Sequence, residues 1–214
     1  MELNLTAAVL CGGQSRRFGR AKEWLDFGGR PLLEHIVETI RPHFQRVLAV
    51  GLRPDAPTLR DVHIVPDAVA GAGPLGGILT ALSAVRTEYT FCFACDAPFI
   101  NPSLVRAMQT LAPGADAVVP KSGPHFQPLF AIYSRNCIAT AREQLLAGYH
   151  KISSIFSHLN VHWVDEAFQQ RHDPDLLSFI NINTPADYAG ALDILARASG
   201  RDGAAVPDFS ITNL

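Results

Sequence analysis

Two unbroken apolar runs constrain the fold of this chain more than any other feature. Residues 7–10 are Ala-Ala-Val-Leu and lead directly into Cys11, while residues 89–95 are almost entirely apolar until Asp96. Short apolar runs without polar alternation are typical of strands that are covered on both faces in a parallel sheet. A chain of 214 residues with 48% hydrophobic content is large enough to bury the core of such a sheet.

Helical patterns alternate with further short strands along the rest of the sequence. The predicted helices cover residues 31–40, 75–85, 102–111, 135–146 and 185–197. The other predicted strands cover residues 47–50, 62–65, 115–119, 128–133, 161–164 and 179–182. Strands that alternate with helices predict an α/β fold with a doubly wound, mostly parallel sheet and helices on both faces. Residues 198–214 are rich in Gly, Ala, Ser and Pro, and we expect them to form a poorly ordered tail.

Composition and cysteine pattern narrow the class of protein. A net charge of −2 provides no overall basic field for nucleic acid, and neither a signal segment nor a membrane-spanning apolar run is present. We therefore expect a cytoplasmic protein without nucleic-acid or membrane partners. Cys92 and Cys95 form a CxxC pair, but their odd separation within a strand directs them to opposite faces, which disfavours a shared redox or zinc site.

The loop after the first strand is suited to a polyphosphate. Gly12 and Gly13 allow a sharp turn that exposes backbone N–H groups, and Arg16, Arg17 and Lys22 follow within ten positions. An ordinary turn beside a solvated basic surface is the alternative, but the clustering of cations favours binding of anionic oxygens.

Two common phosphate-binding motifs are absent from this loop. A Walker loop requires Lys and then Ser or Thr directly after its last glycine, whereas Gly19 is followed by Arg-Ala-Lys-Glu. A dinucleotide fingerprint requires three glycines at a spacing that Gly12, Gly13 and Gly19 do not provide.

Asp96 is the strongest single candidate for a metal ligand. A carboxylate that ends an apolar strand is the type of ligand Mg²⁺ prefers, and the prolines at 98 and 102 delay the next helix, which argues against a capping role. Asn183 ends another predicted strand, although it is also suited to a turn before Thr184. Because ligands gather at the carboxyl ends of parallel strands, we expect Asp67, Asp96 and the glycine loop to converge.

Four segments, in order, carry a resemblance to a known family. Residues 10–22, 73–77, 95–98 and 181–185 resemble four motifs of the molybdenum cofactor guanylyltransferases, and the similarity extends over residues 5–195. The resemblance implies a Rossmann-like, nucleotide-diphospho-sugar transferase-like fold with a nucleotidyltransferase domain at residues 1–197. It further implies Mg²⁺-dependent transfer of GMP from GTP to the phosphate of molybdenum-loaded molybdopterin, with release of pyrophosphate. The recipient molybdoenzyme and cofactor-delivery proteins are further candidate partners.

The same resemblance implies roles for individual residues. Lys22, Arg16 and Asp96 would be catalytic, and Asp96 with Asn183 would hold the metal ion. The implied nucleotide-binding residues are Leu10, Cys11, Gly12, Gly13, Lys22, Asp67, Pro74, Leu75, Gly76 and Asp96. The other half of the cleft would take the pterin, with candidates in two polar loops at His125, Gln127, His150 and Lys151.

Two departures from the family pattern leave alternatives open. Family members commonly have Asp directly before the motif lysine, where this chain has Ala21, and often Asn after the second strand, where it has Val50, Gly51 and Leu52. One alternative is a transferase of the same fold that uses CTP on molybdopterin or another small phosphate. Another is a non-catalytic carrier that binds the nucleotide or cofactor, but Asp96 and Lys22 are both retained.

Overall fold

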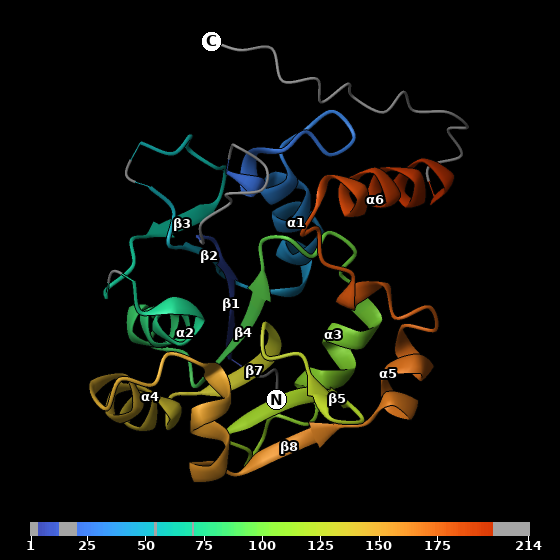
Figure 1. Cartoon of the computed structure of the whole chain (residues 1–214). Coiled ribbons are helices and arrows are strands. Elements are labelled where there is room, and N and C mark those ends of the chain that lie inside the picture. The colour runs from blue at the N-terminus through green and yellow to red at the C-terminus, as the bar shows by residue number, and fades with distance from the viewer. Residues whose placement is uncertain (1–3, 13–20, 54, 70, 199–214) are drawn as a thin grey trace.

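A twisted central sheet carries helices on both faces in the computed structural model (Figure 1), which describes residues 4–12, 21–53, 55–69 and 71–198. The strands are β1 (Leu5–Leu10), β2 (Val47–Val50), β3 (Val62–Val65), β4 (Tyr89–Ala94), β5 (Ala117–Ser122), β6 (His125–Phe126), β7 (Phe130–Ser134) and β8 (Val161–Val164). The α-helices are α1 (Leu32–Ile40), α2 (Gly73–Ala84), α3 (Pro102–Gln109), α4 (Cys137–Leu146), α5 (Glu166–His172) and α6 (Pro185–Ala198). Four short 3₁₀ helices in the described residues are η1 (Lys22–Trp24), η2 (Arg41–His43), η3 (Ile152–His158) and η4 (Leu177–Phe179).

The sheet has a parallel half and a mixed half. Strands β3, β2, β1 and β4 lie side by side in parallel, while β7 pairs antiparallel with both β4 and β5. Strand β8 then joins β5 in parallel, and β6 folds back on β5 as a short hairpin. The predicted doubly wound, mostly parallel α/β fold is confirmed, with β7 as the antiparallel member inside the sheet.

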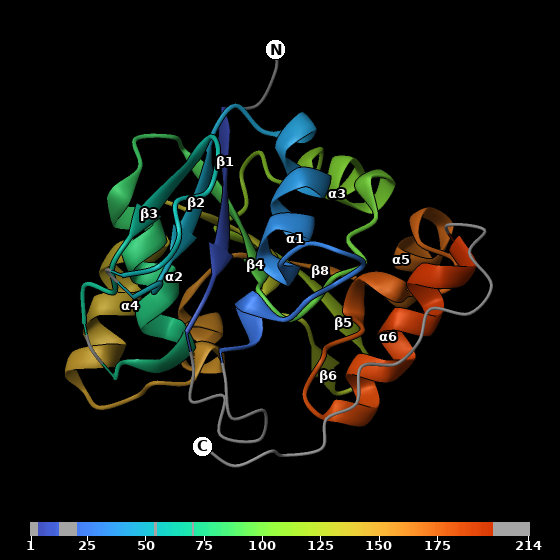
Figure 2. The same cartoon turned by 90° about the horizontal axis from the view of Figure 1, so that it is seen from above.

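Alternate residues of the buried central strands supply two separate cores. Ala7 and Val9 of β1 face the core beneath α1 and α3, whereas Ala8 and Leu10 face the core beneath α2 and α4. All six residues of β1 are buried, as a strand with helices on both sides requires. Figures 1 and 2 show α2 and α4 on one side of the sheet and α3, α5 and α6 on the other.

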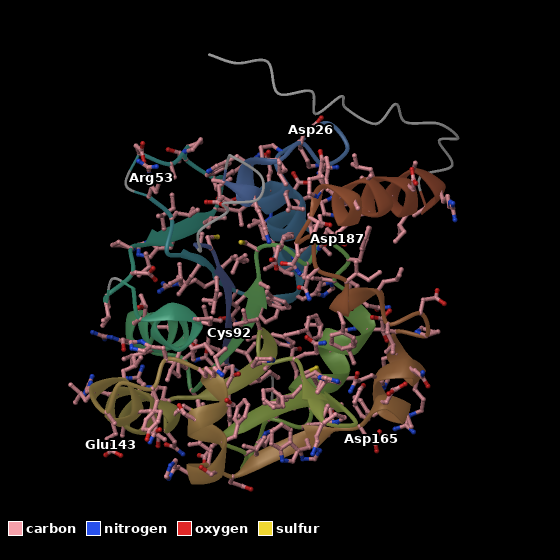
Figure 3. All side chains as sticks on the ribbon, viewed as in Figure 1. Asp26, Arg53, Cys92, Glu143, Asp165 and Asp187 are labelled. Atoms are coloured by element: carbon pink, nitrogen blue, oxygen red, sulfur yellow. The ribbon has the colours of Figure 1, made fainter. Side chains whose placement is uncertain are left out.

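The two cysteines of the CxxC pair lie on opposite faces of the sheet, as predicted. Cys92, labelled in Figure 3, packs in the core beneath α2 and α4, and Cys95 packs in the other core. Burial raises the pKa of the Cys92 thiol well above its usual value. The pair therefore lacks the shared geometry of a redox or zinc motif.

The strand predicted at residues 179–182 is wrong. The segment instead begins with η4 after Leu176, which has a left-handed φ of 52°, and continues as irregular extended chain. Its first N–H groups bond within the local turn rather than to a neighbouring strand: Phe179 donates to the Leu176 carbonyl at 3.2 Å, and Ile180 donates to the Leu177 carbonyl at 3.0 Å. The Ile182 N–H donates to the Asp96 carbonyl at 2.8 Å, which brings this segment beside the end of β4.

Strand β6 and helix α5 were not predicted from the sequence. Strand β6 is a two-residue hairpin arm inside the predicted loop at residues 122–127. Helix α5 is capped by Asp165, whose carboxylate accepts the Phe168 N–H at 2.7 Å, and the buried face of the helix includes the polar Gln169. The Gln169 amide donates to the Val164 carbonyl at 2.8 Å, which allows this polar side chain to be buried. Because the buried position is polar, the segment lacks the apolar periodicity that predicts a helix.

Two other expectations concern membrane-spanning segments and the C-terminal end of the chain. Within the described residues, every helix is too short or too polar to span a bilayer. The predicted last helix is present as α6, which ends at Ala198. The predicted tail therefore lies almost wholly outside the described residues.

Removing the Phe91 ring should strongly destabilise the fold. Phe91 is fully buried in β4, stacks on Phe93 at a centroid distance of 4.3 Å and meets Phe130 edge to face at 5.2 Å. We expect Phe91→Ala to lower the free energy of unfolding by about 3–5 kcal/mol in urea denaturation. Leu146→Ala is the control, because Leu146 is 83% exposed, and it should change stability by less than about 0.5 kcal/mol. Equal effects of the two substitutions would contradict this description of the core.

Candidate active site

The carboxyl ends of β1, β2 and β4 bring the sequence motifs to one edge of the sheet. Backbone pairing continues one residue past each strand: the Cys11 N–H donates to Val50 at 2.7 Å, Gly51 to Val65 at 2.9 Å, and Cys95 to Leu10 at 3.2 Å. The polypeptide is therefore fixed up to the points where the glycine loop and Asp96 begin. The predicted convergence of these strand ends is observed.

Gly12, Gly51 and Asp67 form one group at this edge. Gly12 and Gly51 both have positive φ, 107° and 82°, which favours glycine. A Cβ on Gly51 would lie 2.3 Å from the Cys11 carbonyl oxygen and 3.2 Å from either Asp67 carboxylate oxygen. The absence of a side chain at 51 therefore allows Asp67 and the start of the glycine loop to approach each other closely.

Two titratable groups beside this turn are shifted toward their neutral forms. Burial raises the pKa of Asp67 above its ordinary value. A hydrogen bond with Cys95, together with burial, raises the pKa of the Cys11 thiol well above its ordinary value. Cys11 is therefore a protonated, closely packed side chain at neutral pH, and its contribution to a bound ligand is limited to its backbone.

Lys22, Asp96 and Asn183 form the second group of the site. The Lys22 ammonium donates to Asp96 Oδ2 at 3.1 Å and to Asn183 Oδ1 at 3.1 Å. The side chains of Lys22 and Asp96 are 17% and 23% exposed, so the ion pair is partly shielded from water. Residues separated by 74 and 161 positions in the sequence thus meet around one cation.

The first turn of α6 fixes Asn183. Asp187 Oδ2 accepts the Asn183 N–H at 2.9 Å and the Thr184 N–H at 2.8 Å, while Thr184 Oγ1 accepts the Asp187 N–H at 3.1 Å. These bonds, the one from Asn183 above all, lower the pKa of Asp187. Asp187, labelled in Figure 3, was not among the predicted site residues. The Thr184-Pro-Ala-Asp187 pattern of a reciprocal helix cap was the signal that could have indicated it.

The glycine-rich segment at residues 73–77 forms the first turn of α2. Gly77 packs against Leu10, since a Cβ there would lie 3.5 Å from Leu10 Cδ1, and Gly76 would clash with Ala72 if it carried a Cβ. Pro74 is exposed, but the Leu75 side chain is completely buried in the core. Leu75 can therefore offer a ligand only its backbone.

The predicted pterin residues lie on two exposed segments. His150 lies beside the start of α2, with its carbonyl oxygen 3.6 Å from where a Cβ of Gly73 would be, and Lys151 precedes η3. His125 lies on the β6 hairpin, and the Gln127 N–H donates to the Pro120 carbonyl at 2.9 Å. Of the other predicted site residues, Gly13 and Arg16 lie outside the described residues.

The oxygens of Asp96 and Asn183 are suitably placed to share one cation. The Lys22 ammonium already contacts both at equal distance and stands in for such an ion. In the described part of the chain, no cluster of three or more His, Cys, Asp or Glu side chains offers a metal cage. One carboxylate and one amide are nevertheless enough for Mg²⁺ that keeps water and substrate phosphates among its ligands.

Comparison with known proteins identifies the family. Residues 7–165 match the MobA-like NTP transferase domain. The chain belongs to this family. It is accordingly a nucleotidyltransferase, and enzymes that transfer nucleotidyl groups typically depend on a divalent metal ion.

Curated relatives and solved structures agree with this assignment. A probable molybdenum cofactor guanylyltransferase of Pelotomaculum thermopropionicum is 35% identical over 88% of this chain and 92% of its own length. The molybdenum cofactor guanylyltransferase of Syntrophotalea carbinolica is 32% identical over 86% of this chain and 88% of its own. The structure of molybdopterin-guanine dinucleotide biosynthesis protein A from Archaeoglobus fulgidus is 30% identical, with a TM-score of 0.80, and covers 90% of this chain and 99% of its own. The resemblance inferred from the four motifs is confirmed.

A more distant structure supports the fold class alone. The 2-C-methyl-D-erythritol 4-phosphate cytidylyltransferase of Thermus thermophilus is 18% identical, with a TM-score of 0.66, and covers 92% of this chain and all of its own. A similar fold therefore occurs in a protein named for the transfer of a cytidylyl group. The fold does not by itself select the base.

A side chain at position 51 should lower the free energy of unfolding by more than its positive φ alone would cost. We expect Gly51→Ala to lower the free energy of unfolding by about 2–4 kcal/mol, because a left-handed backbone and a contact with the Cys11 carbonyl act together. Gly29→Ala is the matched control, since Gly29 has a φ of 94° but nothing within 4 Å of the added Cβ. It should cost only about 1 kcal/mol. Chemical denaturation of both variants measures the difference, and equal losses would contradict crowding at position 51.

Proposed function

We propose that this protein transfers GMP from GTP to the terminal phosphate of molybdopterin that already carries molybdenum. The products would be pyrophosphate and the molybdopterin guanine dinucleotide cofactor. The observation that carries the proposal is the meeting of Lys22, Asp96 and Asn183 beside the glycine turn, in a chain whose relatives are named guanylyltransferases.

The chemistry requires charge neutralisation and alignment more than covalent help. The attacking phosphate oxygen is already an anion, so no general base is needed, and the bond from the α-phosphorus to the pyrophosphate leaving group breaks as the new bond forms. Lys22 would stabilise negative charge that develops on the pyrophosphate, and Arg16 is proposed to assist it. Mg²⁺ bound by Asp96 and Asn183 would supply Lewis acidity at phosphate oxygens.

The nucleoside would occupy the turn that follows β1. Backbone groups from Leu10 to Gly13 are proposed to face the base and ribose, together with Pro74, Leu75 and Gly76 at the start of α2. Asp67 is proposed as a further nucleoside contact, because its carboxylate lies against Gly12 and Gly51. Without a side chain at 51, this region relies on Asp67 where many family members would offer an Asn.

The pterin is proposed to bind against two exposed segments beside the site. His150 and Lys151 lie next to the start of α2, and His125 and Gln127 lie on the hairpin after β5. Histidine and lysine can both donate to a phosphate, while an amide can pair with a pterin edge. We propose these four residues as the pterin contacts.

Release of pyrophosphate is the test that separates an enzyme from a carrier. The protein mixed with Mg²⁺, GTP and molybdenum-loaded molybdopterin should release pyrophosphate, and Asp96→Asn should reduce turnover by about a hundredfold or more, because it removes a charge that binds the metal. Asp193→Asn is the control on the exposed surface of α6 and should retain normal turnover. No pyrophosphate release from the unsubstituted protein would favour the carrier, and full activity of Asp96→Asn would refute the metal-binding role.

Guanine should be preferred over cytosine. The N1–H, N2–H₂ and O6 edge of guanine can pair with backbone groups near Leu10 and Gly76, and CTP lacks that edge. Two buried partners left unpaired at about 1–3 kcal/mol each predict a preference for GTP of about a hundredfold or more. Competition between equal concentrations of labelled GTP and CTP measures the preference. Comparable incorporation of both would overturn the guanine assignment and support the cytidylyltransferase alternative.

A further inference from the structure

The Lys22 ammonium occupies the space between the two oxygens proposed to hold the metal ion. It donates to Asp96 Oδ2 and to Asn183 Oδ1, each at 3.1 Å. A divalent ion bound by the same oxygens would lie next to a positive charge in a partly buried setting. Because such a setting screens charges less than bulk water does, the two cations compete for these oxygens.

The backbone that carries the two oxygens is held by bonds that do not involve Lys22. Asp96 is held by the strand end, where its carbonyl accepts the Ile182 N–H at 2.8 Å. Asn183 is held by Asp187, which accepts its N–H at 2.9 Å. Removal of the lysine charge therefore leaves the backbone of both residues in place, and their carboxylate and amide oxygens become available to another cation.

Lys22 can leave this position by side-chain rotation alone. Its backbone is fixed in η1, where its carbonyl accepts the Leu25 N–H at 3.0 Å. A lysine side chain has four flexible methylene groups, so its ammonium can exchange one set of oxygens for another without movement of the backbone. Triphosphate oxygens are strong acceptors for such a group.

We propose that Lys22 acts as a placeholder cation, which excludes divalent metal from Asp96 and Asn183 until a nucleoside triphosphate draws its ammonium away. This proposal rests on the proposed function for the identity of the metal ligands. Metal and nucleotide then bind with positive coupling, because each is favoured by the same movement of Lys22. The free protein then binds divalent metal weakly, because Lys22 already contacts both oxygens.

Titration with Mn²⁺ in the absence of nucleotide tests the placeholder directly. Free Mn²⁺ is measured by electron paramagnetic resonance for the unsubstituted protein and for Lys22→Met, which keeps an unbranched side chain only one atom shorter but removes its charge. We expect Lys22→Met to bind Mn²⁺ about tenfold more tightly or better, within the usual range of coupling between sites. Lys22→Gln is a second neutral variant that should show the same gain, and Lys22→Arg keeps the charge and should bind as weakly as the unsubstituted protein.

Two further variants test whether the gain in Mn²⁺ affinity arises at Asp96 and Asn183. Lys121→Met is the matched control, because the Lys121 ammonium lies over the Trp163 ring at 5.3 Å and should not affect Mn²⁺ affinity. The double variant Lys22→Met/Asp96→Asn should lose the gain. Unchanged or weaker Mn²⁺ binding by both neutral Lys22 variants would overturn the proposal, as would a gain that persists in the double variant.

The titration distinguishes this proposal from the proposed function. It contains neither GTP nor molybdopterin, so its outcome does not depend on which group the protein transfers. Tighter Mn²⁺ binding by Lys22→Met, in a protein that releases no pyrophosphate, would support the placeholder and refute guanylyl transfer. Normal pyrophosphate release without a gain in Mn²⁺ affinity would refute the placeholder alone.

Discussion

The central strand β1 hydrogen-bonds in parallel to β2 on one side and to β4 on the other, so three carboxyl ends stop at the same level of the sheet. Pairing of Leu10 with both Val50 and Ala94 fixes this register. A shift by one residue would turn Cys11 and Asp96 toward the opposite faces and separate the two halves of the site. The site therefore depends on the packing that locks β1 between its neighbours.

Helices on both faces of the sheet hold the strands in this register and shield them from water. The alternating side chains of β1 and β4 fill two cores, and only the strand ends are left to face a ligand. Parallel strands buried in this way present their last residues at an edge where neighbouring loops leave space, which is the usual place for ligands in α/β proteins. The fold thus positions the reactive groups without placing any of them within a core strand.

Charge balance across the site follows from this arrangement. A cation from the loop after β1 meets a carboxylate from the end of β4 and an amide from the segment before α6. In a transferase of polyphosphates, the same groups must neutralise phosphate oxygens during the reaction. A partly buried ion pair that can exchange one partner for a phosphate meets both needs: it balances charge within the protein, and it neutralises phosphate oxygens during the reaction.

The sequence alone determined the α/β class, most element positions and the placement of Gly12 and Asp96 directly after strand ends, because apolar runs and motif spacing are local signals. It failed at residues 179–182, where an apolar run forms no ladder because the N–H groups of Phe179 and Ile180 donate to carbonyls of the preceding turn. It missed α5 because Gln169 occupies a buried position. Only the tertiary structure joined Lys22 with Asp96 and Asn183, since contacts across 74 and 161 positions depend on strand order and register, which no local pattern encodes.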